Sequence, residues 1–154
     1  MLAAQVRSGQ LAHAYIFSGQ DSLEQAISLA AKLNCGEDNS PCGSCPVCLN
    51  IAAGFYPDCH LIEPDRGSHR LEGMKALALQ AQLSAANGGW KVFILSQADK
   101  ISDEAANNLL KLLEEPPPRT IFILLSDQPE QLLPTIRSRC QLFVLDNGFV
   151  RQDS

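Results

Sequence analysis

The chain has 154 residues, of which 45% are hydrophobic and 19% are charged, and its formal net charge is −5. These values are typical of one globular domain and exclude an intrinsically disordered chain. The negative charge argues against a duplex-DNA binder that works alone, because phosphate binding needs a positive surface. No apolar run approaches the roughly 18 residues of a membrane span, and the N-terminus lacks the h-region of a signal peptide. We therefore expect no membrane association and a cytoplasmic location.

The N-terminal part of the chain predicts a buried strand followed by a helix. Residues 13–19, HAYIFSG, form a short apolar run that ends in glycine, which is typical of a strand. After it, apolar residues recur at helical spacing from Leu23 to Leu33, and Ser22 can cap this helix. A cysteine-rich module over residues 35–48 follows the helix directly.

The rest of the chain continues to alternate between strands and helices. Strands are predicted over 59–64, 91–96, 120–126 and 141–145, helices over 71–86 and 103–115, and a short helical stretch over 129–140. Ser102 is the expected cap of the helix over 103–115, and the prolines at 116–118 end it. Strands that are apolar throughout and alternate with helices indicate an α/β fold, with a parallel five-stranded sheet covered on both faces.

Four of the six cysteines form the pattern C-x6-C-x2-C-x2-C, at Cys35, Cys42, Cys45 and Cys48. Four thiolates are the ligand set of a closed tetrahedral zinc site, and such a site is structural because no position stays open for water. In a reducing cytoplasm, a metal is favoured over disulfides. An iron–sulfur cluster, and cysteines that are unligated or disulfide-bonded, remain the alternatives.

The segment after the first strand differs from a phosphate-binding loop at the positions that carry its chemistry. Such a loop reads G-x-x-x-x-G-K-[ST]. Gly19 fits the first glycine, but Glu24 stands at the second glycine, Gln25 at the lysine and Ala26 at the hydroxyl residue. Glu24 also places negative charge where a polyphosphate would bind. We therefore expect no ATP in this site.

The residues at the end of the third predicted strand also indicate that no ATP is hydrolysed here. A nucleotide hydrolase presents Asp-Glu there, for the magnesium ion and the attacking water, and this chain has Ser96 and Gln97. Two interpretations of the residues stay open. Either a nucleotide-binding domain has lost its chemistry, or these are ordinary loops with no such origin.

Several stretches resemble bacterial clamp-loader subunits of the AAA+ class, the delta-prime and gamma/tau subunits of DNA polymerase III. They are LAHAYIFSG, the four-cysteine module, ADK…AANNLLKLLEEPP and LLPTIRSRCQ, and the resemblance extends over nearly the whole chain. In that family, gamma/tau subunits keep a working phosphate loop, whereas delta-prime subunits typically do not bind ATP. The losses at Glu24, Gln25, Ala26, Ser96 and Gln97 therefore place the chain with the delta-prime type.

The resemblance also implies a domain organisation. It implies a three-layer α/β core of the P-loop/AAA+ type over residues 1–146, with the zinc module at 35–48 inserted into it. It further implies C-terminal domains, a helical lid and a helical collar, so residues 147–154 are expected to be a tail or a truncated linker to them.

The family resemblance assigns a role to Arg139. In these subunits, the arginine of the Ser-Arg-Cys triplet acts as an arginine finger on the ATP of a neighbouring subunit. Without the resemblance, Arg139 is interpreted as a surface arginine at a helix end.

The function implied by the resemblance is that of a non-ATPase subunit in a ring with gamma/tau and delta subunits. That ring loads the sliding clamp on primed DNA. Two other functions compete with it. An ATP-hydrolysing gamma/tau-type subunit is disfavoured by the missing lysine and Asp-Glu pair. A stand-alone zinc-dependent nucleic-acid-binding module is disfavoured by the negative net charge and by the lack of interleaved aromatic residues.

Overall fold

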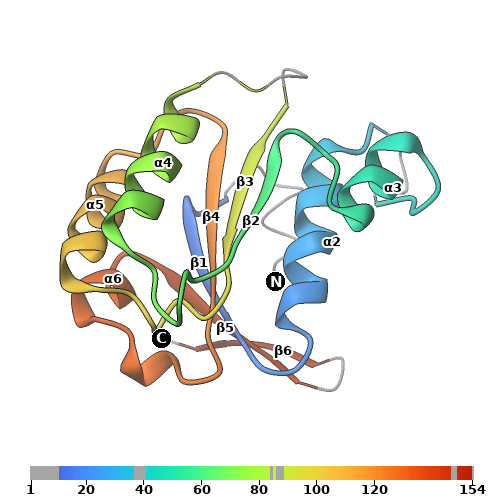
Figure 1. Ribbon diagram of the computed structural model, residues 1–154. Coiled ribbons are helices and arrows are strands. Elements are labelled where there is room, and N and C mark those ends of the chain that lie inside the picture. The colour runs from blue at the N-terminus through green and yellow to red at the C-terminus, as the bar shows by residue number, and fades with distance from the viewer. Residues whose placement is uncertain (1–10, 37–40, 84, 86–88, 147–148, 154) are drawn as a thin grey trace.

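A central β-sheet with helices on both sides organises the chain (Figure 1). The computed structural model describes residues 11–36, 41–83, 85, 89–146 and 149–153. Residues 1–10 of the predicted domain, 37–40 of the cysteine module, and 147, 148 and 154 of the expected tail lie outside this description. None of the helices described in these ranges has both the length and the apolar character needed to cross a membrane.

The strands and helices lie close to the predicted segments. The strands are β1 (Ala14–Ser18), β2 (Cys59–Ile62), β3 (Lys91–Leu95), β4 (Thr120–Leu125), β5 (Gln141–Asp146) and β6 (Phe149–Asp153). The helices are α2 (Ser22–Asn34), α3 (Pro46–Ala53), α4 (Leu71–Gln82), α5 (Asp103–Glu114), α6 (Pro134–Arg137) and the short 3-10 helix η1 (Pro129–Gln131).

The sheet has the strand order β2-β3-β4-β1-β5-β6. Strands β1 to β5 pair in parallel, which confirms the predicted parallel five-stranded sheet. The sixth strand, β6, is a difference from the sequence-based expectation. It lies in the segment expected to be a tail or linker, and it pairs antiparallel with β5 from Asp146↔Phe149 to Leu142↔Asp153. The mainly polar sequence of β6 gives little strand signal, and the strand forms because the edge of β5 offers backbone partners.

Both faces of the sheet are covered, which produces three layers (Figure 1). All five residues of β1 are buried. Tyr15 and Phe17 belong to the core under α2 and α3, whereas Ile16 belongs to the core under α4, α5 and α6. Successive side chains of a strand point to opposite faces, so a strand buried on both sides is largely apolar, and Ser18 at the end of β1 is the polar exception.

Hydrogen bonds at the ends of two helices explain where these helices begin and end. The hydroxyl of Ser102 accepts a backbone N–H bond at 3.2 Å from the first turn of α5, which confirms the predicted cap. Helix α4 ends at Gln82; the sequence predicts helix to residue 86, and residues 84 and 86 of that prediction lie outside the described residues. The buried ammonium of Lys91 donates hydrogen bonds to the carbonyl oxygens of Ala81 and Leu83. It thereby satisfies carbonyl groups that a helix leaves unpaired at its C-terminus.

Helix α3, which begins at the end of the cysteine module, is a second difference, because it is not among the helices that the sequence predicts. Pro46 occupies the start of the helix, where its fixed φ is favourable. Gly54 ends the helix with a φ of 84°. Cys48 and Ile51 are the buried residues of α3, and they pack in the same core as α2. Helix α3 is eight residues long, too short for a clear helical period in the sequence.

Candidate functional site

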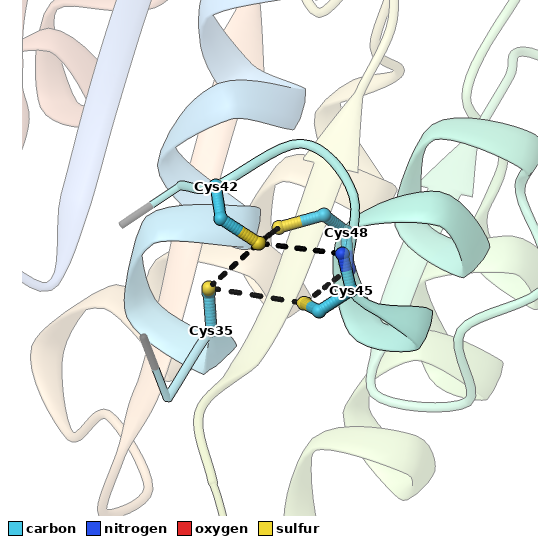
Figure 2. A group of neighbouring side chains, drawn as sticks. All are labelled: Cys35, Cys42, Cys45 and Cys48. Atoms are coloured by element: carbon cyan, nitrogen blue, oxygen red, sulfur yellow. Dashed lines mark hydrogen bonds between the residues drawn. The ribbon is translucent and has the colours of Figure 1, made fainter. Parts of the chain in front are cut away.

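The four predicted metal ligands come together where α2 meets α3 (Figure 2). Cys35 follows α2 directly, Cys42 and Cys45 precede α3, and Cys48 lies in the first turn of α3. Their sulfur atoms all lie within 4.8 Å of one another. An ion among them would join the C-terminal end of α2 to the N-terminal end of α3.

The distances between the sulfur atoms fit a tetrahedral metal site. The Sγ atom of Cys35 lies 3.7 Å from that of Cys42 and 3.8 Å from that of Cys45, and the Sγ atoms of Cys42 and Cys48 are 4.0 Å apart. Zinc–sulfur bonds of about 2.3 Å place tetrahedral ligands about 3.8 Å apart. The sulfurs are too far apart for disulfides, and none of these four cysteines forms one. The group therefore has the number, type and spacing of ligands that a closed metal site requires.

Backbone N–H groups donate hydrogen bonds to two of the sulfurs. The N–H of Cys45 donates to Sγ of Cys42 at 3.3 Å, and the N–H of Cys48 donates to Sγ of Cys45 at 3.4 Å. Gly43 has a φ of 78°, which favours glycine in this turn. Backbone hydrogen bonds from Ser44 and Cys45 lower the pKa of the Cys42 thiol to about 6, whereas burial raises the pKa of Cys48 to about 11. Backbone N–H groups thus favour at Cys42 the thiolate form that binds a metal, whereas burial disfavours it at Cys48.

A cleft of about 420 Å³ lies at the carboxyl ends of β1, β3 and β4. Ligands of parallel α/β sheets bind at this edge. Ser96 and Gln97, at the place of the Asp-Glu pair, line the cleft. Its charged side chains are Asp99, Asp127 and Lys100, so carboxylates outnumber ammonium groups in it. That balance is unfavourable for a polyphosphate.

The loop after β1 is short, because α2 begins three residues after Gly19, and it does not leave room to wrap a phosphate. The N–H and the hydroxyl of Ser22 both donate to the carbonyl oxygen of Gly19, at 3.4 Å and 2.9 Å. Helix α2 begins at Ser22, so Glu24 and Gln25 are helical residues, and Ala26 is buried in the core. In a phosphate-binding loop, the four residues between the two glycines form the loop that wraps the phosphates, whereas α2 already includes the last two of these positions, Ser22 and Leu23. Here the helix takes up that space.

Part of the cleft is held together by a hydrogen-bonded link that the sequence did not indicate. The hydroxyl of Ser126, after β4, donates to Oδ1 of Asp99 at 2.8 Å and accepts the N–H of Gln128 at 3.1 Å. The N–H of Ser126 donates to the carbonyl oxygen of Phe17 in β1 at 3.1 Å. The ends of β1 and β4 and the loop after β3 are thus connected through protein groups.

Arg139 follows α6, a helix that lies on the opposite side of the sheet from α2 and α3 (Figure 1). Its Nη1 donates to the carbonyl oxygen of Thr135 at 2.8 Å and to Oγ of Ser138 at 3.3 Å, and its Nη2 lies 2.8 Å from Oε1 of Glu114. The side chain of Arg139 is 35% exposed and that of Glu114 is 51% exposed. The sequence indicates Arg139 but not Glu114, because the two residues are 25 positions apart and no local pattern connects them.

Sequence comparisons relate the chain to subunits of one replication enzyme. The family described as DNA polymerase III, delta subunit, matches residues 1–148. The chain is 39% identical over 145 residues to DNA polymerase III subunit delta' of Bacillus subtilis, covering 92% of this chain and 44% of that protein. It is 39% identical over 138 residues to subunit delta' of Pseudomonas aeruginosa (85% and 42% covered). It is 35% identical over 144 residues to subunit gamma/tau of Mycobacterium tuberculosis (90% and 25% covered). The chain thus spans less than half the length of these curated relatives.

Solved structures share the fold. A DNA polymerase III, gamma subunit-related protein of Thermotoga maritima superimposes with a TM-score of 0.66 at 20% identity, covering 94% of this chain and 45% of that one. The Bacillus subtilis DNA clamp loader delta protein gives a TM-score of 0.59 at 10% identity, with 94% and 41% covered. At these identities the likeness concerns the three-layer architecture.

Proposed function

Because the chain belongs to the DNA polymerase III delta subunit family, we propose that it is a delta-prime-type, non-ATPase subunit of the bacterial clamp loader. In this role it joins gamma/tau and delta subunits in a ring, and it helps that ring to load the sliding clamp on primed DNA. It binds no ATP in its own cleft and provides Arg139 to the ATP of a neighbouring subunit.

The observation that carries this proposal is the chemistry of the cleft. The cleft lies at the edge of the sheet where nucleotides bind in parallel α/β folds. Nucleotide hydrolysis requires a glycine loop, a lysine, a hydroxyl residue and an Asp-Glu pair. The chain has Glu24, Gln25, Ala26, Ser96 and Gln97 at the corresponding positions. The early start of α2 further supports a cleft that does not hold a triphosphate.

Calorimetric titration of the full-length subunit with Mg-ATP tests the first part of the proposal. We expect no heat of binding at micromolar ATP, whereas a gamma/tau subunit measured in parallel should bind. Binding by this subunit with a micromolar Kd would contradict the delta-prime assignment. It would favour the alternative, an ATP-hydrolysing subunit of the gamma/tau kind.

The proposed role of Arg139 is supported by its charge and its position. A guanidinium stays protonated and can contact two phosphate oxygens. Arg139 stands at the surface, and its contacts with Thr135 and Glu114 give it a defined direction. In nucleotide hydrolases, an arginine finger supplied by another chain raises kcat by about 10³ to 10⁵.

Replacement of Arg139 in the assembled clamp loader tests this role. Arg139→Ala should lower the rate of ATP hydrolysis stimulated by clamp and primed DNA, and Arg139→Lys should not restore it, because a point charge cannot reproduce the guanidinium fork. The complex has several ATP sites, and only those that receive Arg139 from this subunit should slow down. The total rate of ATP hydrolysis therefore falls by their share. Arg137→Ala is the matched control, since Arg137 is exposed two residues earlier. An unchanged rate for Arg139→Ala, or an equal loss for Arg137→Ala, would remove the finger role.

We also infer that the ion at the four cysteines is a structural zinc. Four thiolate ligands at tetrahedral spacing favour zinc and leave no position for a reacting water. The residues that would hold it are Cys35, Cys42, Cys45 and Cys48. Its role is to fasten α3 to α2, and it takes no part in the chemistry at Arg139.

A further inference from the structure

The ion pair between Arg139 and Glu114 is not explained by the stability of the elements that carry it. Glu114 is the last residue of α5, and Glu115 follows it. The C-terminal end of a helix carries partial negative charge, so carboxylates there are unfavourable and a lysine or arginine would stabilise α5 better. Both side chains of the pair are also substantially exposed, and exposed ion pairs contribute little to folding.

The ion pair does restrict the direction of the Arg139 side chain. Thr135 and Ser138 hold Nη1 from α6, and Glu114 holds Nη2 from α5. A guanidinium has five N–H groups, so these three contacts leave at least two donors for an acceptor that comes from outside the subunit. Without Glu114, the guanidinium would be held from α6 alone and would be freer to rotate.

Helix α5 is well suited to hold this carboxylate in place. Ser102 caps its first turn, Leu109, Leu112 and Leu113 pack in the core beside α6, and Pro116 follows its end. The carboxylate of Glu114 is therefore supported by a fixed element, while Arg139 lies after the short helix α6.

We propose that Glu114 is a positioning residue for Arg139 that holds the guanidinium in the direction from which it reaches the phosphates of a neighbouring subunit. This inference rests on the proposed finger role of Arg139. It assigns to Glu114 an effect on the hydrolysis step and no effect on the binding of ATP by the neighbour.

The test uses the full-length subunit assembled with its partners, with hydrolysis stimulated by clamp and primed DNA. Glu114→Gln keeps an acceptor oxygen and removes the charge, and Glu114→Ala removes both. We expect kcat to fall roughly three- to thirty-fold at the affected site, as for other coupled pairs, with less loss for Gln than for Ala and with KM for ATP unchanged. Glu115→Gln is the matched control, because it removes the same charge from the neighbouring exposed position, and it should leave kcat unchanged.

A double variant distinguishes positioning from a structural effect. In an Arg139→Ala background, Glu114→Ala should cause no further loss of kcat. A further loss there would overturn the inference, as would an equal loss with Glu115→Gln or a full kcat with Glu114→Ala. Arg139→Ala measured alone separates the two proposals. If it lowers kcat and Glu114→Ala does not, only the positioning role fails. If it does not lower kcat, the finger role and the positioning role fail together.

Discussion

Removal of the metal that we propose at the four cysteines is expected to unfold α3 and leave the sheet folded. Helix α3 has eight residues, below the length at which an isolated helix is stable. It buries Cys48 and Ile51, which contribute on the order of 3–6 kcal/mol. Ordering residues 41–53 costs about 1–2 kcal/mol per residue, which is more than this burial supplies. Metal binding in small zinc domains contributes about 10–16 kcal/mol. This is comparable to the difference between the cost of ordering residues 41–53 and the contribution of the two buried side chains.

Hydrogen exchange before and after chelation measures this local unfolding. After removal of the metal, backbone amides of residues 46–54 should lose their protection, whereas those of β1, β3 and β4 should keep it, because both faces of these strands remain packed. Elemental analysis should find one zinc per chain. Cys45→Ser should lose it, and Cys59→Ala, a cysteine outside the cluster, should retain it. Full protection of α3 in protein free of metal would refute the reasoning that the ion holds this helix.

Three further predictions concern stability. Burial raises the pKa of the Cys140 thiol to about 12 from an ordinary value of 9.0, so the stability it contributes is complete below pH 9 and is lost as the pH rises towards 12. Denaturant titrations should show the free energy of unfolding falling between pH 9 and 11 by up to about 1.4 kcal/mol per pH unit from this group, and Cys140→Ala should remove that slope. Lys91→Met should lower the free energy of unfolding by about 2–4 kcal/mol, because it removes charged hydrogen bonds to the end of α4; Lys100→Met, at an exposed lysine, should change it by less than about 0.5 kcal/mol in the same assay. Ser126→Ala should cost about 1–2 kcal/mol in urea unfolding, because the buried Ser126 hydroxyl bonds Asp99 and a backbone N–H.

The parallel sheet and the cysteine cluster were predictable because both depend on local patterns. A strand buried on two faces is apolar at nearly every position, as β1 and β4 are apart from Ser18 and Thr120 at their ends, and cysteines at short spacing are close in space by necessity. The strand β6 and the pair between Glu114 and Arg139 were not predictable in this way. Each depends on a surface that exists only after the sheet and α5 have formed.

Helix α5 lies between the cleft, where we propose that no nucleotide binds, and Arg139, which we propose acts on a neighbouring subunit. The loop before α5 contains Ser96 and Asp99 of the cleft, and the last residue of α5 holds Arg139. Within this loop, Asp99 accepts a hydrogen bond from the hydroxyl of Ser126. If the cleft holds no nucleotide, as we propose, the direction of Arg139 does not depend on a nucleotide cycle within its own subunit. The subunit can then present its arginine to a neighbour in the same position throughout the cycle of the complex.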